Sequence, residues 1–497
     1  MKSIRIALIT ALAFFAAATA RAQLDDLADK PSDTTPPAAE KDVTIALHGY
    51  AQANFVVSRN NMGVSGNPWL DARYEFPRIG GTLQLELEAN ASDVAHFFSA
   101  VQIEYNAAGE KTNFPKFYYP NAFAQYTYFL KRADFDRGEI YKYPTINVRE
   151  TYIDLYGKHV TFRVGQQIIS WGEIEGIEAP SDIVIPWDYT TMSNYFEYSR
   201  IGVTAANLSF HFAKQQLQLI WIPIFQPAKL PMESLYNRGV TSIKRPCFEA
   251  RNGEYAARLS GSIGTQFRYG LGFLYGFDDM PDTRVRMLGQ FQTIPPLPIG
   301  VFIPNVVLTE MYYNRIYQPS LDLGIQIGEI LSWKVSGNAQ ITRDFWGKRD
   351  LVKNSTVTYL TGPETSNIFW KIYLGFYVGQ QWVLNYTAPA PPMDTLFRLN
   401  SGRLPNEQIL EGYGQSHPYR WMVSSNIQRS FLANDTLDFQ VRFALYTDPK
   451  LQEWNYVVYP YFMYKFANGV STSLGFVFAN RQGDSRNMIV SETRYSF

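Results

Sequence analysis

Apolar and polar residues alternate through much of the chain, and the alternation is clearest in residues 148–169. Because successive side chains of a β-strand point to opposite faces, this pattern predicts two strands, each with one polar and one apolar face. Gly157-Lys158 lies between them, and a glycine at the first position of a two-residue loop suits a type II′ hairpin turn. The segment therefore predicts an antiparallel hairpin.

The turn fixes an expected register for this hairpin. A two-residue loop pairs Tyr152 with Arg163 and Ile153 with Phe162, which puts polar groups together and apolar groups together. A shift by one residue would exchange the two faces, so this register is the expected one. The polar face then carries Glu150, Tyr152, Asp154 and Arg163.

Similar alternating segments continue to the C-terminus. The main ones are residues 43–58, 83–88, 95–105, 201–210, 212–221, 254–263, 266–277, 321–328, 333–341, 370–378 and 437–445. Short polar turns alternate with long connections, which include residues 107–145, 170–200, 222–253, 278–305, 344–367 and 388–417. Short turns at one end and long extracellular loops at the other are typical of outer-membrane β-barrels. Prolines in 278–305 exclude a central strand there, so we expect a loop.

A sheet that spans hydrocarbon must close on itself, because lipid offers backbone groups no hydrogen bonds. We therefore predict an all-β fold, a transmembrane antiparallel β-barrel formed by residues 43–497. Antiparallel closure with both ends in the periplasm needs an even number of strands. The segments 114–130 and 294–304 are the hardest to assign, and we expect about 16 strands, within a range of about 14–18.

The first 22 residues have the layout of a secretory signal peptide. A basic start with Lys2 and Arg5 precedes an apolar run, and Ala20-Arg21-Ala22 gives a cleavage site. The alternative, a membrane anchor, needs a longer apolar run than this one. Residues 23–42 are acidic, rich in proline and poor in large apolar groups, which predicts a flexible periplasmic lead-in.

Composition narrows the class further. The chain has 45 basic and 45 acidic residues, and cleavage of the signal peptide leaves it slightly acidic, so nothing favours a nucleic-acid partner. The single cysteine, Cys247, excludes an intramolecular disulfide framework. Aromatic residues make up 15% of the chain, as expected where aromatic girdles meet both membrane interfaces. A large secreted β-sandwich or β-helix enzyme is the main competing class.

The C-terminal residues resemble the final strand of bacterial outer-membrane proteins. Tyr495 and Phe497 share one face, opposite Glu492 and Arg494, and the chain ends on the aromatic residue. We interpret Tyr495 and Phe497 as the signal that the barrel-insertion machinery reads. The expected location is the bacterial outer membrane, with its lipids as partners and the oligomeric state open.

Four stretches resemble the DUF1302 family of bacterial outer-membrane β-barrel proteins: VRETYIDLY, FRVGQQIISWGE, SDIVIPWDYT and LQLIWIPIFQPAKLP. The resemblance is clearest over residues 146–231 and departs from the usual pattern at Ile185-Pro186, where Asn-Pro is more common. It implies a β-barrel channel tied to uptake or export of hydrophobic compounds such as lipids, sterols or terpenes.

The polar face of the hairpin is the first candidate site. On a lumen wall, charged side chains tune the selectivity of a pore. The candidates for such a constriction are therefore Glu150, Tyr152, Asp154 and Arg163. A structural network of ion pairs inside a filled barrel is an equal alternative. Trp171, Glu173 and Asp182 follow the hairpin, and they either line an entry funnel or plug or fix the fold of an inward loop.

An enzyme would need a different set of residues. Glu173 with Glu175, or Asp182 with Asp188, are conceivable carboxylate pairs for glycoside hydrolysis, although their separation is unknown from sequence. The five histidines are scattered without ligand spacing, and no nucleophile, phosphate-binding or metalloprotease motif is present. We expect no catalytic residues, no metal and no cofactor.

The aromatic and proline-rich segments 114–130, 222–231 and 294–304 favour an apolar solute, because exposed apolar loops usually mark a binding surface. Packing of these loops on each other explains them equally well. The expected function is a channel for small hydrophobic or amphipathic molecules. A general diffusion porin, or a filled barrel with a structural or enzymatic role, is the alternative. The sequence names neither the solute nor the direction of transport.

Overall fold

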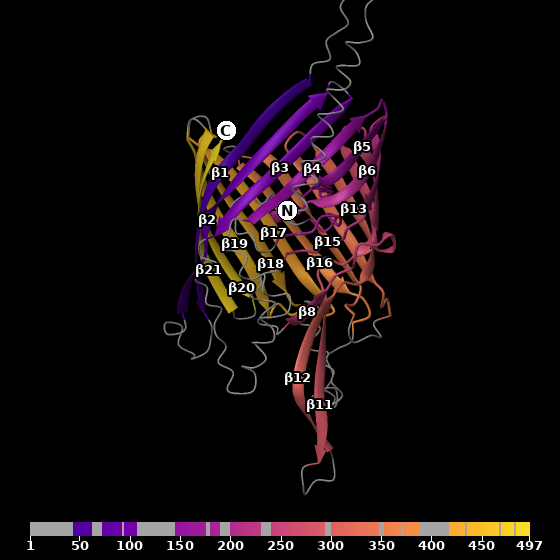
Figure 1. Ribbon diagram of the computed structural model, residues 1–497. Coiled ribbons are helices and arrows are strands. Elements are labelled where there is room, and N and C mark those ends of the chain that lie inside the picture. The colour runs from indigo at the N-terminus through magenta and orange to yellow at the C-terminus, as the bar shows by residue number, and fades with distance from the viewer. Residues whose placement is uncertain are drawn as a thin grey trace, which may run out of the picture.

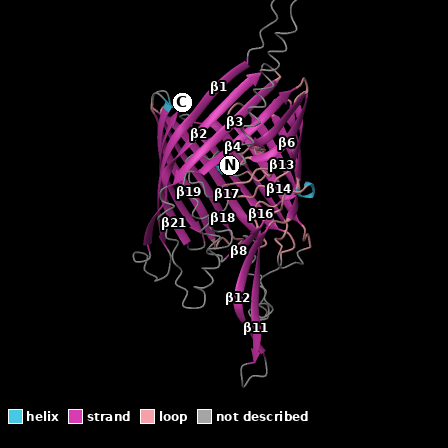
Figure 2. Cartoon of the chain, in the orientation of Figure 1, coloured by secondary structure: helices cyan, strands magenta, loops and turns pink. Residues whose placement is uncertain are grey.

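The computed structural model describes fourteen stretches of the chain: residues 43–61, 72–91, 94–106, 145–174, 179–188, 199–229, 240–293, 300–346, 352–368, 372–386, 417–432, 435–466, 469–481 and 484–497. The predicted signal peptide and lead-in lie outside these residues. Strands dominate the described part, and helix is limited to short turns such as Ala250–Asn252 (Figure 2). Within this part, no helix has the length and apolar character of a membrane span.

Eighteen strands form one closed antiparallel barrel (Figure 1). They are β1 (Val43–Asn61), β2 (Ala72–Ala91), β3 (Ala95–Asn106), β4 (Thr145–Tyr156), β5 (Val160–Gln167), β6 (Val203–Phe212), β7 (Gln215–Ile222), β9 (Glu254–Ile263), β10 (Phe267–Phe277), β13 (Arg315–Ile327), β14 (Leu331–Thr342), β15 (Thr356–Ile368), β16 (Ile372–Val383), β17 (Tyr419–Phe431), β18 (Leu437–Thr447), β19 (Trp454–Lys465), β20 (Val470–Arg481) and β21 (Asp484–Ser496).

Each barrel strand pairs with its neighbour along the chain, and the last strand pairs with the first. Tyr50 of β1 lies opposite Ser496 of β21, and Gly49 and Phe497 exchange two backbone hydrogen bonds of 3.0 Å. This closure leaves no open sheet edge between the first and last strands, which a sheet in hydrocarbon requires. The predicted fold class is confirmed.

The strand number is 18, at the top of the expected range and above the expected value of about 16. The segment 278–305, expected to be a loop, forms most of a hairpin outside the barrel, with strands β11 (Asp282–Thr293) and β12 (Gly300–Tyr312). Pro304 lies at a register shift in this hairpin, where a missing backbone donor is tolerated. The segment 114–130 lies outside the described residues.

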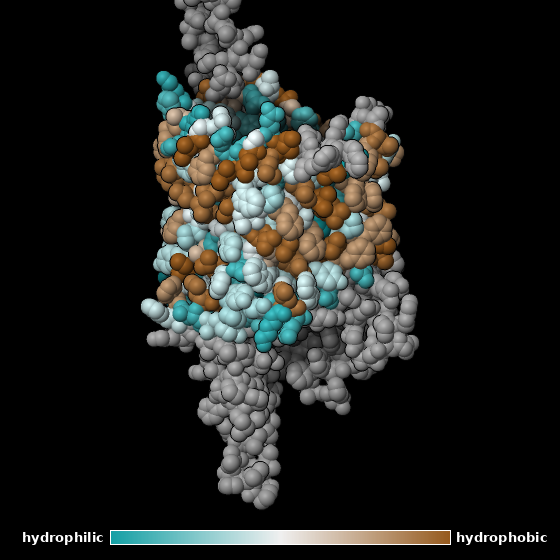
Figure 3. Space-filling view, turned by 180° about the vertical axis from the view of Figure 1, so that it is seen from behind, coloured by the Kyte–Doolittle hydropathy of each residue, from teal (hydrophilic) through white to brown (hydrophobic). Residues whose placement is uncertain are grey.

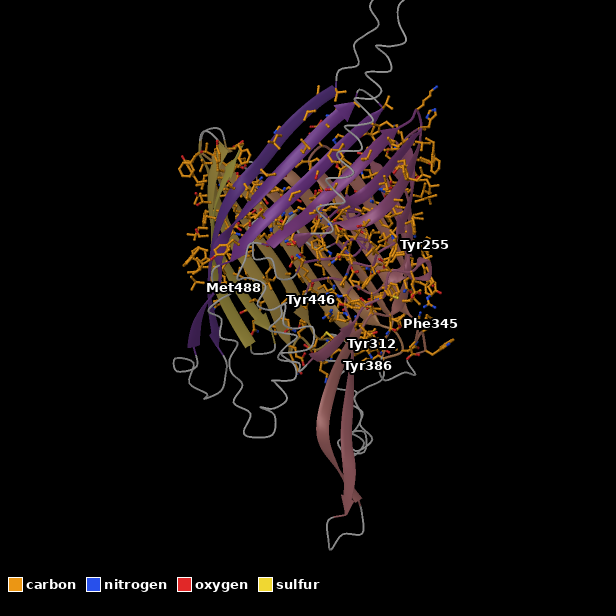
Figure 4. The ribbon with its side chains drawn as sticks, in the orientation of Figure 1. Tyr255, Tyr312, Phe345, Tyr386, Tyr446 and Met488 are labelled. Atoms are coloured by element: carbon orange, nitrogen blue, oxygen red, sulfur yellow. The ribbon has the colours of Figure 1, made fainter. Side chains whose placement is uncertain are left out.

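The outer wall of the barrel is apolar. Residues that alternate with lumen-facing ones expose large side chains, and Leu271, Trp333 and Phe462 are each 41–50% exposed. Figure 3 shows hydrophobic residues over much of the wall, with hydrophilic residues towards the rims. Tyr255 lies on this outer surface (Figure 4). An apolar band on a closed barrel with an even number of strands places the protein in the bacterial outer membrane.

The two ends of the barrel differ, as the sequence predicts. Short turns join strands at the end where the C-terminus lies, and long connections leave the opposite end (Figure 1). The β11–β12 hairpin projects from the end with the long connections, well beyond the barrel (Figure 1). By the usual orientation of such barrels, the end from which the hairpin projects is extracellular.

The base of the hairpin is held firmly. The short strand β8 (Val240–Lys244) pairs in parallel with the last residues of β12. The Lys353 ammonium donates to the Asp278 carboxylate at 2.7 Å and to the Met280 carbonyl at 2.6 Å, and lies 4.0 Å from Asp282. These contacts fix the hairpin to the barrel rim.

The register of the β4–β5 hairpin differs from the predicted one by two residues. Asp154 lies opposite Arg163, Tyr152 lies opposite Gly165, and Ile153 lies opposite Val164. The turn is longer than two residues, because the Gly157 amide donates to the Val160 carbonyl at 2.7 Å and Tyr156 pairs with Thr161. A two-residue shift keeps each side chain on its face, so the predicted faces are right and the predicted partners are wrong.

The outward face predicts a depth-dependent cost of charge. Leu271 lies at the middle of β10, opposite Leu259 and Leu321, with half of its surface exposed. Leu271→Arg should lower the free energy of unfolding in lipid by about 2–4 kcal/mol, because the guanidinium would sit near the bilayer midplane.

The matched control is Ile45→Arg, close to the first residue of β1 and 54% exposed. It should cost only about 0–1 kcal/mol at the interface. Urea unfolding of the protein in lipid vesicles measures both values. Equal costs at the two positions would contradict the assignment of the apolar band.

Candidate functional site: a loop and a polar cavity inside the barrel

A long connection folds into the barrel lumen. It leaves the wall after Gln167, the last residue of β5, and rejoins it at Val203, the first residue of β6. We call residues 168–202 the inner loop. Its described parts are largely buried, and residues 181–188 are all buried. A connection with this degree of burial on the inside of a barrel divides the lumen.

The inner loop packs first against the wall next to it. Ile169, Trp171, Ile183 and Val184 form one buried cluster with lumen-facing residues of β6, β7, β9 and β10. The Trp171 indole donates to Gln218 of β7 at 2.8 Å. A side chain at Gly272 of β10 would meet the Trp171 ring, so this glycine makes room for the indole. The large apolar residues of the loop are therefore used in packing.

The inner loop then reaches strands that are distant in sequence. The Ser181 hydroxyl donates to Asp322 of β13 at 2.5 Å, and the Ser336 hydroxyl of β14 donates to Ser181 at 2.7 Å. The Asn338 amide donates to the Pro180 carbonyl at 2.6 Å. Ile174 and Ala179 pack with Leu360 of β15 and Tyr377 of β16. The loop thus extends from β6 and β7 to β13–β16.

The three predicted loop residues all belong to this arrangement. Trp171 packs as described, and the Glu173 carbonyl accepts a hydrogen bond from Lys334 at 2.6 Å. The Asp182 carboxylate accepts from the Trp171 amide and from the Ser170 hydroxyl, both at 2.9 Å, with Arg200 at 3.8 Å. Burial raises the pKa of Asp182 above its ordinary value, against the effect of these partners. All three residues hold the loop in its inward position.

The predicted constriction residues form a compact network on the lumen wall. Asp154 is fully buried and binds Arg163 through two hydrogen bonds of 2.6 and 2.8 Å. His96 lies 3.3 Å from Asp154 and 3.3 Å from Glu88. The Arg163 guanidinium stacks over the Tyr152 ring at 3.9 Å. Because Asp154 already has three side-chain partners, its geometry favours the structural alternative over a selectivity filter.

Glu150 stands apart from this network. Its carboxylate accepts a hydrogen bond from the Ile168 amide at 2.9 Å, at the point where the chain leaves β5 for the lumen. Glu150 therefore caps the start of the inner loop. The structure thus brings Tyr152, Asp154 and Arg163 together and gives Glu150 a different position.

A polar cavity of about 220 Å³ remains between the inner loop and the wall formed by β1–β5. Its walls carry both signs of charge, with Lys229 and Asp188 paired at 2.9 Å. The residues that contribute most of its polar character are Tyr50, Gln52, Glu104, Arg149, Arg200 and Lys229. A volume of this size holds several water molecules or the polar end of a small solute.

Arg149 reaches this cavity because of a β-bulge. Ala100 lies opposite Glu150, while the next residue, Val101, lies opposite Val148, so Arg149 is an extra residue in β4. Bulges redirect side chains and are common next to functional sites. Regular alternation hides this position, which is why the sequence did not single out Arg149. The cavity residues on β1, the inner loop and the β7 connection were missed because only the fold brings them together.

The C-terminal aromatic residues lie on the outer wall, as expected. Tyr495 is 49% exposed and Phe497 is 48% exposed, and their rings lie 6.0 Å apart. Glu492 on the opposite face is buried in the lumen, at 1% exposure. The amphipathic final strand is therefore present, and its role as an insertion signal stays a prediction.

Carboxylates for an alternative enzyme are already engaged. Asp182 is held by the inner loop and Asp188 is paired with Lys229, while Glu175 lies outside the described residues. In the part of the chain that the structure describes, no group of three or more potential ligands is arranged to hold a metal ion. Cys247 is a free, exposed thiol.

Comparison with known proteins adds structural neighbours. No family model matches the chain, so the resemblance to DUF1302 stays a prediction, and no curated protein matches in sequence. Among solved structures, OccAB4 of Acinetobacter baumannii is similar at a TM-score of 0.48 with 7% identity, over 91% of this chain and 98% of that one. The outer membrane protein OpdK of Pseudomonas aeruginosa has a TM-score of 0.47 with 9% identity, over 91% and 98%. These values assign this chain neither a family nor a solute.

The wall network predicts a stability defect on loss of its central charge. Asp154→Asn should lower the free energy of unfolding by roughly 2 kcal/mol, because it leaves the Arg163 guanidinium without its anion while part of that group stays in contact with water. Adding Arg163→Met should recover part of the loss in a double-mutant cycle. Additive losses in urea unfolding would show that the pair contributes no coupling.

The inner loop predicts a pH dependence. A carboxyl group whose pKa is raised in the seated loop stabilises that state fully below its ordinary pKa and loses the effect as the pH rises through the raised value. Open-channel current noise, which reports loop motion, should therefore increase with pH. Asp182→Asn should flatten the pH dependence of the noise. The control Ser181→Ala should raise the noise at every pH and leave its pH dependence unchanged. An unchanged pH profile in Asp182→Asn would contradict this role.

Proposed function

We propose that this protein is an outer-membrane channel for small amphipathic molecules. The observation that carries the proposal is the lumen itself: an eighteen-stranded barrel in which the inner loop leaves a polar cavity with charges of both signs. Of the charged residues around the cavity, Asp188 is buried, Glu104, Arg149 and Arg200 are partly exposed, and Lys229 is half exposed. A channel needs such groups to bind a solute and release it.

The polar end of the solute would contact the cavity. Arg149, Arg200 and Lys229 offer donors, while Glu104 and Asp188 offer acceptors. This lining supports a solute with a polar head over a purely hydrophobic one such as a sterol or terpene hydrocarbon. The notion of a lipid-like solute comes from the resemblance to DUF1302 and is kept here only for the apolar part of the molecule.

The sequence favours a hydrophobic solute because of its apolar connections, but the structure of residues 222–229 gives this reading less support. In the described part of 222–231, Ile222 and Phe225 are buried, and Phe225 packs against Phe277 and Tyr313 at ring distances of 5.3 and 4.9 Å. Ile224 remains 47% exposed. These residues mainly stabilise the extracellular rim. The case for an amphipathic solute therefore rests on the cavity.

Planar-bilayer recording tests this function. The purified protein should pass a small current that a single-chain zwitterionic amphipath blocks, because the head would occupy the cavity next to the inner loop. Arg149→Gln should weaken this block by about tenfold, equivalent to about 1.4 kcal/mol. Arg343→Gln, at an exposed position after β14, is the control and should leave the block unchanged.

A large, steady current that is indifferent to amphipaths, in both the wild-type protein and Arg149→Gln, would contradict the proposal. That result would point to a general diffusion porin for polar solutes.

A further inference from the structure

The backbone pairing of the barrel wall is incomplete between β4 and β6. β4 has 12 residues and its neighbour β5 has 8, and their ladder covers only Thr151–Tyr156 of β4. Among the described residues, Thr145–Glu150 has no backbone ladder on this side, because the chain leaves β5 for the lumen after Gln167. On the opposite edge of β4, the backbone ladder with β3 continues to Thr145.

Side chains close this part of the wall where backbone pairing stops. The Gln166 amide donates to the Val148 carbonyl at 2.6 Å, and the Glu150 carboxylate accepts from the Ile168 amide at 2.9 Å. Gly202, just before β6, lies directly against the Arg149 carbonyl, with no room for a side chain. We call this junction the seam: Val148–Glu150 on one side, and Gln166, Ile168 and Gly202 on the other.

The seam lies within the apolar band of the outer wall. Ile146, on β4 beside the seam, is 51% exposed, and Leu155 further along the same strand is 47% exposed. Both belong to the outward face. A glutamine in such a band is costly unless its amide is bonded, and the carbonyl of Val148 supplies that bond.

The polar cavity reaches this seam. By strand register, Val148 pairs with the outward residue Val101, and Gln166 pairs with Thr151 and the exposed Thr204. Both nevertheless line the cavity, together with lumen residues such as Gln52 and Asn147. At the seam, therefore, residues that the strand register assigns to the outward face also border the cavity.

From this geometry, we propose that the seam is a lateral gate through which the hydrocarbon tail of an amphipathic solute passes between the lumen cavity and the bilayer. The inference rests on the proposed channel function and adds a route to it. The head stays in the polar cavity while the tail enters the apolar band beside Ile146. The solute class is a single-chain amphipath with a zwitterionic head, because the cavity offers both signs of charge.

The energetics of the seam suit a gate. Parting it breaks the hydrogen bonds from Gln166 to Val148 and from Ile168 to Glu150, whereas parting β4 from β5 over Thr151–Tyr156 breaks a backbone ladder. A tail that inserts also removes apolar surface from water, which favours the open state when a solute is present. The gate therefore opens at one place and leaves the barrel closed elsewhere.

A reversible cross-link tests the gate. Val148→Cys with Gln166→Cys, in a Cys247→Ser background, places two thiols across the seam. The matched control is Ile153→Cys with Val164→Cys, an outward pair on the intact β4–β5 ladder. The protein is placed in lipid vesicles, and transfer of a fluorescent lysophosphatidylcholine into the bilayer is measured beside entry of a neutral disaccharide. Each pair is compared oxidised and reduced.

We expect oxidation of the seam pair to slow amphipath transfer by about tenfold, a barrier increase of about 1.4 kcal/mol. Disaccharide entry should stay the same, reduction should restore transfer, and the control pair should have no effect. Transfer that is unchanged by the seam cross-link would overturn the gate and leave the channel standing. Equal slowing of both solutes would also overturn it, because it indicates an axial path. Absence of amphipath transfer in every variant would overturn the proposed function as well.

Discussion

The hydrogen-bonding needs of the backbone in hydrocarbon determine this structure. Every strand must have two neighbours inside the bilayer, so the chain closes through β1 and β21 and uses 18 strands to do so. Alternation along each strand then follows, with apolar residues towards lipid and polar residues towards the lumen. A barrel of this width leaves space in its lumen, and the inner loop occupies part of that space.

The inner loop converts a wide barrel into a divided one. Its apolar residues pack on β6, β7, β9 and β10, and its polar groups bond to β13 and β14. Beside β1–β5 a small polar cavity lies between the loop and the wall. The loop leaves the wall early, after only eight residues of β5, and this same short strand creates the junction held by Gln166 and Glu150. The inner loop and the seam therefore have one origin, the early end of β5.

The sequence was enough to predict the fold class and the strand faces of the β4–β5 hairpin, because alternation and turn composition are local properties. The partners of Arg163 were wrong by two residues, because the Gly157–Val160 hydrogen bond lengthens the turn and no side-chain pattern reports it. Arg149 was missed because a bulge breaks the alternation on which the prediction depends. Asp322 and Ser336 were missed because their contacts with Ser181 join residues 141 and 155 positions apart.

Those distant contacts also constrain the order of assembly. Ser181 cannot find Asp322 and Ser336 until β13 and β14 have joined the growing sheet, so the loop has to wait while more than a hundred residues become ordered. Contacts of such long sequence separation are slow to form, because loop-closure entropy is paid before they contribute. We therefore expect the loop to form its contacts with β6 and β7 before its contacts with β13 and β14.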